Sequence, residues 1–186
     1  MFAYCGNNPV VRQDLTGQSW KTFWNKVKDW LTKKKEEAET NKDITETKGF
    51  TGSAAFGGGA SVSVGRTKDT KGNIGIAVTF NGGGGFPNVG VGIFESVNNA
   101  PTIYEQEGLG TAVGASGGPW AVAVGAEYNM LINQETGQVY HGGTLSATFG
   151  FYPTIVEVHG EVGYTFVWGF NIYDVAINVV DWALGN

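Results

Sequence analysis

The chain has 186 residues, of which 41% are apolar and 16% are charged, with a formal net charge of −5. Residues 53–186 hold three of the twelve Lys and Arg against ten acidic residues, so they lack the basic face that a nucleic-acid-binding protein needs. A lone cysteine excludes an internal disulfide, and the sequence predicts neither a signal peptide nor a membrane-spanning helix, which would need a run of about 18 apolar residues.

Residues 1–17 are rich in Gly, Asn and Pro and are predicted to form turns. Their stretch "FAYCGNNPVVRQDLTGQ" resembles the end of the RHS repeat-associated core domain. It departs from that family at Val11, where Asn is usual, and at Leu15, where Pro is usual. The positions that match the family are Tyr4, Cys5, Asn7, Asn8, Pro9, Val10, Asp14 and Gly17.

In that family the core closes a large β-shell and is followed by a variable C-terminal effector, often a toxin. The resemblance therefore implies that the residues after Gly17 form an effector tip of polymorphic-toxin type. It further implies export as part of a larger RHS protein and a cognate immunity protein as partner. Because Leu15 stands where the family has Pro, we do not expect self-cleavage at Asp14.

Residues 18–49 are predicted to form an amphipathic helix, over 18–40 and capped by Ser19, followed by a charged linker. One face of the helix is apolar, and the opposite face carries lysines. Such a helix suits a membrane interface, or packing on the rest of the protein. The apolar residues are Trp20, Phe23, Trp24, Val27, Trp30 and Leu31.

From residue 50 the hydrophobic period changes to two, which is typical of β-strands. We expect a mainly β domain over 50–186: an antiparallel glycine-rich meander or small barrel of about seven or eight strands. The expected connections include "RTKDTKGN", "NGGGGF" (81–86), "ASGGPW" (115–120) and "NQETGQ". The spacing of apolar residues from Ile172 predicts a C-terminal helix that ends at Gly185.

The alternation along the strands sets bulky residues against small ones, rather than apolar against charged. A closed barrel with a tight lumen, or a membrane barrel with bulky residues toward lipid, would produce this pattern. A glycine face approached closely by the C-terminal helix would produce it too. An exposed Val/Ile/Phe belt would indicate a membrane or oligomer surface, and a buried belt would indicate a soluble core.

Aromatic residues gather toward strand ends, as they do in the interfacial girdles of membrane barrels. Together with the tryptophans of the N-terminal helix, they are the candidates for membrane or partner contact. These candidates are Trp20, Trp24, Trp30, Trp120, Tyr164, Phe166 and Trp168.

The candidates for catalysis are His159, Glu157 and Glu161, which project from one face of one strand, with His141 and Glu127 as further candidates on neighbouring strands. Over a strand at about 3.3 Å per residue, three such side chains are too spread out to meet at one ion without help from other strands. The same trio could bind a metal only with that help, so no metal site is predicted. No cofactor site is predicted either, because the glycine-rich stretches lack the Lys and the strand-to-helix context of a phosphate loop.

The sequence therefore favours a non-enzymatic effector that binds or enters membranes, with pore formation as one form of that activity. Two alternatives stay open. One is a soluble barrel that acts through a protein partner or a small ligand, and the other is an enzyme toxin centred on His159.

Overall fold

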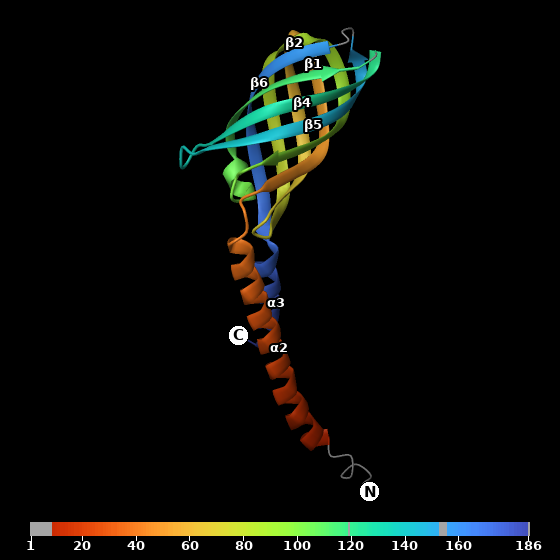
Figure 1. Cartoon of the computed structure of the whole chain (residues 1–186). Coiled ribbons are helices and arrows are strands. Elements are labelled where there is room, and N and C mark those ends of the chain that lie inside the picture. The colour runs from red at the N-terminus through yellow and green to blue at the C-terminus, as the bar shows by residue number, and fades with distance from the viewer. Residues whose placement is uncertain (1–8, 119, 153–155, 186) are drawn as a thin grey trace.

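The computed structural model describes residues 9–118, 120–152 and 156–185. Figure 1 shows a β-barrel with a stalk of two helices projecting from one end. The elements are α2 (Pro9–Glu39), β1 (Thr45–Asp69), β2 (Asn73–Asn98), the 3-10 helix η1 (Ile103–Gln106), β3 (Gly108–Gly117), β4 (Trp120–Asn133), β5 (Val139–Tyr152), β6 (Val156–Asn171) and α3 (Ile172–Leu184). The expected mainly β fold with an N-terminal and a C-terminal helix is confirmed.

Helix α2 begins at Pro9, so the expected turns at 9–17 and the expected cap at Ser19 are wrong. Proline suits the first position of a helix, because its missing N–H would have no partner there. Gly17 inside the helix costs only about 1 kcal/mol relative to alanine, which a long helix tolerates. Residues 1–8, which hold part of the RHS-like stretch, lie outside the described residues.

The antiparallel sheet runs in the order β1-β2-β5-β4-β3-β6, and an additional pairing of β2 with β6 closes it into a barrel. Residues 73–84 of β2 pair with β6, whereas residues 89–98 pair with β5. Each half of β2 therefore forms a separate part of the barrel wall, and β1 pairs with β2 along both halves. The two halves of β1 meet side by side, where the Ser63 hydroxyl donates to Thr51 Oγ1 at 2.9 Å.

The glycine-rich stretch 81–86 is part of β2 and not the expected hairpin connection. It pairs with residues 57–61 of β1, next to a register shift between Ala55 and Gly57. Gly57 has φ of 88°, a left-handed conformation that glycine adopts without strain. The glycines thus let both strands bend at the end of the barrel while their pairing continues.

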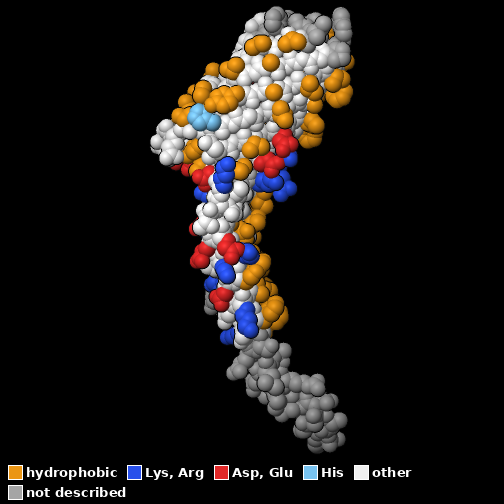
Figure 2. Space-filling view, in the orientation of Figure 1, with side chains coloured by type: hydrophobic (Ala, Val, Ile, Leu, Met, Phe, Trp, Pro, Cys, Tyr) orange, Lys and Arg blue, Asp and Glu red, His pale blue; other side chains and the backbone are white. Residues whose placement is uncertain are grey.

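The wall of the barrel has bulky apolar side chains outside and small or polar side chains inside. Outward residues are widely exposed, for example Val91 at 68%, Leu145 at 66% and Val158 at 64%. Figure 2 shows hydrophobic side chains spread over the barrel surface. Among the described residues, the buried apolar cluster comprises only Ala77, Ile103 and Val167. This arrangement inverts that of a water-soluble barrel, in which the large apolar residues fill the interior.

The two ends of the barrel differ in charge. The stalk joins one end, here called the base, because α2 precedes β1 and α3 follows β6 directly. Antiparallel pairing then places the middles of β1 and β2, the ends of β3 and β5 and the starts of β4 and β6 at the opposite end, here called the tip. The described segments that reach the tip contain no Asp, Glu, Lys or Arg; they are 49–65, 74–94, 108–118, 120–126, 142–152 and residue 156.

Charged side chains gather at the base, below the apolar wall (Figure 2). The Glu46 carboxylate contacts Lys48 Nζ at 2.6 Å and Lys68 Nζ at 2.7 Å, and Lys71 pairs with Asp43 at 3.1 Å. The hydrogen bond from Lys48, followed by that from Lys68, lowers the pKa of Glu46 to about 2.

The stalk is a pair of helices held by ion pairs and a small apolar contact. Lys28 pairs with Asp181 and Lys35 with Asp174, both at 2.6 Å, and Val180 of α3 is buried. Helix α3 starts at its cap Asn171 and ends at Gly185, as expected. It packs against α2, so the expectation that it covers a glycine face of the sheet is wrong. Within the described part of the chain, neither helix is long and apolar enough to cross a membrane.

Candidate functional site

The candidate site is the lumen of the barrel, which encloses a cavity of about 190 Å³. Because side chains alternate along a strand, every strand sends each second residue into this space. The inward residues are mostly Gly, Ala, Ser, Thr and Asn, together with one histidine and three glutamates. The lumen is therefore a polar compartment surrounded by an apolar outer wall.

His159 of β6 and Glu127 of β4 meet inside the lumen, with His159 Nε2 3.2 Å from Glu127 Oε1. Strand β3 lies between them, and its Gly114 is in register with both residues. A Cβ on Gly114 would lie 2.4 Å from Glu127 Cγ and 3.0 Å from His159 Nε2. The pair therefore depends on a glycine that the periodicity alone did not mark as special.

The other two glutamates of the lumen have separate partners. The Glu161 carboxylate accepts a hydrogen bond from the Ser61 hydroxyl at 3.1 Å. Glu157, which is buried, accepts two hydrogen bonds from Asn88 Nδ2, at 3.0 and 3.1 Å. Glu157, His159 and Glu161 thus share one face, as the sequence predicted, but each contacts a different strand.

The structure does not bring His141 to this cluster. Its side chain lies on the outer face of β5, where its Nδ1 is 2.7 Å from the hydroxyl of Tyr128. Of the two candidates on neighbouring strands, Glu127 reaches His159 and His141 does not. Across residues 9–118, 120–152 and 156–185, no group of three or more His, Cys, Asp and Glu is arranged to hold a metal ion.

Helix η1 closes the base of the lumen, which the sequence reasoning did not anticipate. Gln106 is buried; its Nε2 donates to Thr67 Oγ1 at 2.9 Å, and its Oε1 accepts from Asn98 Nδ2 at 2.9 Å. Ile103 is fully buried, and a Cβ on Gly169 would lie 2.4 Å from its Cδ1. The nine residues between β2 and β3 show no strand or helix periodicity, so the sequence pattern did not mark Ile103 and Gln106 as residues that plug the lumen.

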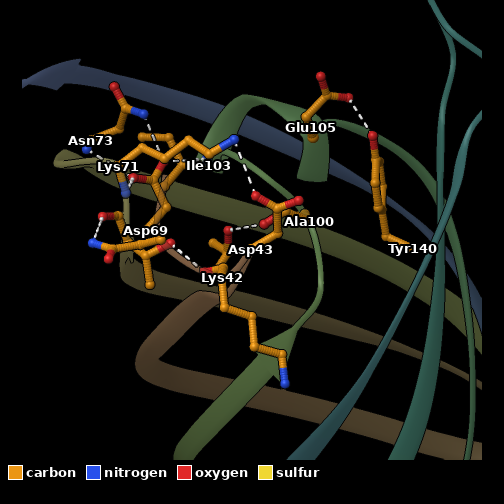
Figure 3. Close-up of polar contacts among 12 residues, drawn as sticks. Lys42, Asp43, Asp69, Lys71, Asn73, Ala100, Ile103, Glu105 and Tyr140 are labelled. Carbon is orange, nitrogen blue, oxygen red and sulfur yellow. Dashed lines mark hydrogen bonds and ion pairs between the residues drawn. The ribbon is translucent and has the colours of Figure 1, made fainter. Parts of the chain in front are cut away.

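Polar contacts fix η1 to the strands around it (Figure 3). The Ile103 N–H donates to Asp69 Oδ2 at 2.9 Å, and this hydrogen bond connects η1 to the β1–β2 turn. The Tyr140 hydroxyl donates to Glu105 Oε2 at 3.0 Å. Burial, followed by this hydrogen bond to Glu105, raises the pKa of Tyr140 to about 12. Tyr140 therefore stays a neutral donor throughout the ordinary pH range.

The predicted aromatic contact residues fall in two places. Tyr164, Phe166 and Trp168 form a ladder on the outer face of β6, with ring centroids 4.7 Å and 6.1 Å apart. Trp20 and Trp24 stack edge-to-face in α2, and Trp30 of the same helix is exposed. The side chain of Trp120 lies outside the described residues.

Comparison with solved structures finds distant likeness to this chain. No family model and no curated protein matches the chain. The virulence-associated protein VapB from the intracellular pathogen Rhodococcus equi aligns over 67% of this chain and 99% of its own, with 11% identity and a TM-score of 0.32. The red fluorescent protein lanRFPdam aligns over 67% of this chain and 61% of its own, with 6% identity and a TM-score of 0.25. Likeness at this level carries no functional argument.

Proposed function

We propose that this chain is a non-enzymatic effector whose barrel inserts into a lipid bilayer. The observation that carries the proposal is the polarity of the wall, which is bulky and apolar outside and polar inside. In the described residues, the outward positions of β6 from Val156 to Phe170 hold Val, Gly, Tyr, Phe and Trp and no charged residue. A strand needs about 9–11 tilted residues to cross a bilayer, and β6 exceeds that length.

Water is a poor environment for such a surface. Soluble monomers rarely expose contiguous apolar patches larger than a few hundred Å², and larger patches mark contacts with lipid or protein. The barrel closes because β2 pairs with both β5 and β6, and because the two halves of β1 meet, with Ser63 contacting Thr51. A closed wall satisfies its backbone N–H and C=O groups internally. Closure supports insertion, because unpaired backbone groups cannot be placed in hydrocarbon.

The charge distribution supports one direction of entry. The tip segments are uncharged and would enter the bilayer first, whereas the base and the stalk carry all twelve Lys and Arg. Carrying a charged side chain to the bilayer centre costs about 2.5–3.5 kcal/mol, so the charged end would stay on the side of entry. The effector role rests on the RHS resemblance of the first 17 residues, from which the cognate immunity protein also follows as a proposed partner.

Flotation of the purified full chain with phosphatidylcholine–phosphatidylglycerol vesicles tests insertion. We expect the protein to float with the vesicles and to resist extraction by alkaline carbonate, because it is held by the apolar wall and not by surface charge. Recovery of a folded, monomeric protein in the soluble fraction would overturn the proposal and favour a soluble barrel.

The enzymatic alternative rests on the His159–Glu127 pair, and one variant separates it from the membrane proposal. His159→Ala removes the only imidazole in the described lumen while leaving the outer wall unchanged. We expect full-length His159→Ala to inhibit bacterial growth as wild type does. Loss of toxicity, with flotation and folding retained, would favour the enzyme and contradict a purely membrane-acting effector.

A further inference from the structure

The lumen is narrow, which limits what could pass through an inserted barrel. Because β1 and β2 each contribute two halves, the circumference is that of a barrel of about eight strands, whose interior is only wide enough for side chains or one small ligand. The cavity that remains is about 190 Å³. Such a space holds a few water molecules, but not a solute of dye size.

The charges of the lumen have one dominant sign. The ionisable side chains that line the cavity are Glu127, Glu157, Glu161 and His159, and no Lys or Arg accompanies them. Even a protonated His159 would leave an excess of negative charge. Carboxylates that line a narrow pathway attract cations and repel anions.

Polar side chains are distributed along the whole lumen. Near the tip, Asn88 contacts Glu157, and farther down β6, Thr165 is 2.9 Å from Thr79. At the base, Gln106 is the last of these polar side chains, and it forms hydrogen bonds with Thr67 and Asn98. A chain of hydroxyl, amide and carboxylate groups of this kind supports the movement of protons and of partly dehydrated small cations.

We infer that the inserted barrel conducts protons and small monovalent cations, and excludes anions and dye-sized solutes. This inference rests on the proposed function and specifies what the inserted barrel transports. The three lumen glutamates provide the selectivity. Helix η1, which closes the base through Gln106 and Ile103, is the constriction, and ions pass it on the side of the Gln106 cluster. The ions pass along the lumen without any covalent step.

Vesicles of phosphatidylcholine and phosphatidylglycerol test this inference with three probes. Pyranine inside the vesicles reports the proton movement that a K⁺ gradient drives when both cations can cross the membrane. Lucigenin reports chloride, and calcein reports leakage of a large anionic dye. We expect wild-type protein to dissipate the proton and K⁺ gradients while lucigenin emission stays constant and calcein stays inside.

Two variants locate the pathway. The triple variant Glu127→Gln, Glu157→Gln, Glu161→Gln should reduce the cation flux by about tenfold, because it removes the charge that concentrates cations. The control Glu135→Gln removes one charge from the exposed β4–β5 loop and should leave the flux unchanged. Gln106→Ala should increase the flux, because it shortens the side chain at the constriction.

Flotation of each sample shows whether a negative result contradicts the conduction inference or the proposed function. Protein that floats but releases calcein, or that passes chloride as readily as K⁺, overturns the inference and leaves the proposed function intact. Protein that floats but conducts no ions likewise overturns the inference and leaves the proposed function intact. A triple variant that floats and conducts like wild type overturns the role of the glutamates. Protein that does not float overturns the proposed function, and the inference with it.

Discussion

The barrel and the stalk both expose apolar side chains, but the charged side chains of the stalk lie at its surface, whereas three glutamates of the barrel lie in its lumen. In the stalk, Val180 is buried and Lys28 and Asp181 pair at the surface, while Trp30 and Trp182 are widely exposed. In the barrel, most valines and phenylalanines face outward, while three glutamates and several asparagines face inward. On the proposed function, water surrounds the base and the charged face of the stalk, and lipid surrounds the wall of the barrel.

Among the substitutions considered, a charged residue on the outer wall should have the largest effect on stability. Val162 lies in the middle of β6 and is 54% exposed, so Val162→Arg removes no buried contact. In a bilayer we expect it to reduce the stability of the inserted barrel by about 2–4 kcal/mol. The matched control Val139→Arg lies at the base and should cost only about 0–1 kcal/mol. Urea titration of both variants in vesicles measures the difference, and equal effects would contradict a lipid-facing wall.

Removal of the C-terminal helix should affect the stalk much more than the barrel. Deletion of residues 172–186 keeps Asn171, whose Nδ2 donates to the carbonyl of Lys71 at 3.1 Å. It loses the hydrogen bond from Ile172 N–H to the carbonyl of Gly72, which contributes about 1 kcal/mol. We expect far-UV circular dichroism to retain the strand signal. Collapse of that signal would mean that α3 supports the sheet after all.

The ion pairs of the stalk should contribute still less. Lys28 and Asp181 are both partly exposed, so a double-mutant cycle with Lys28→Ala and Asp181→Ala should give a coupling of about 0.2–1 kcal/mol. High salt should weaken it further. A coupling of several kcal/mol that persists in salt would mean that the stalk is not surrounded by water.

The smallest effect should be the response of the base to acid. Because pairing with Lys48 and Lys68 lowers the pKa of Glu46 to about 2, the carboxylate contributes stability above its unfolded pKa of about 4.5. That contribution is lost as pH falls toward about 2. Glu46→Gln should therefore be less stable than wild type at pH 7 and converge with it near pH 2. Thermal midpoints across this range check it, and a constant difference at all pH values would contradict it.

The sequence predicted the class of fold well, because strand alternation is a local property. Residues such as Ile74, Ile76 and Val78 specify one face of a strand regardless of where that strand lies. The pattern could not say whether that face points inward or outward, since both arrangements have period two. The ring closure decides this, and it depends on pairings between residues far apart in the chain, such as β2 with β6.

The candidate site could be predicted only in part for the same reason. Glu157, His159 and Glu161 were found because they share one strand face. The Glu127 contact needed the register of three strands and the space above Gly114, neither of which is local. The bend in β2 was missed because a run of glycines is compatible with either a loop or a strand, and only pairing with β1 selects the strand.

The alternation of lipid contact along β5 tests the central claim most directly. In a Cys5→Ser chain, single cysteines at the outward positions Leu145 and Phe149 and at the inward positions Ser146 and Thr148 can each carry an NBD fluorophore. We expect vesicle-bound protein to show strong quenching by lipid-attached quenchers at the two outward positions and weak quenching at the two inward positions. Equal quenching at all four, or none at the outward pair, would contradict a barrel whose apolar outer wall faces lipid.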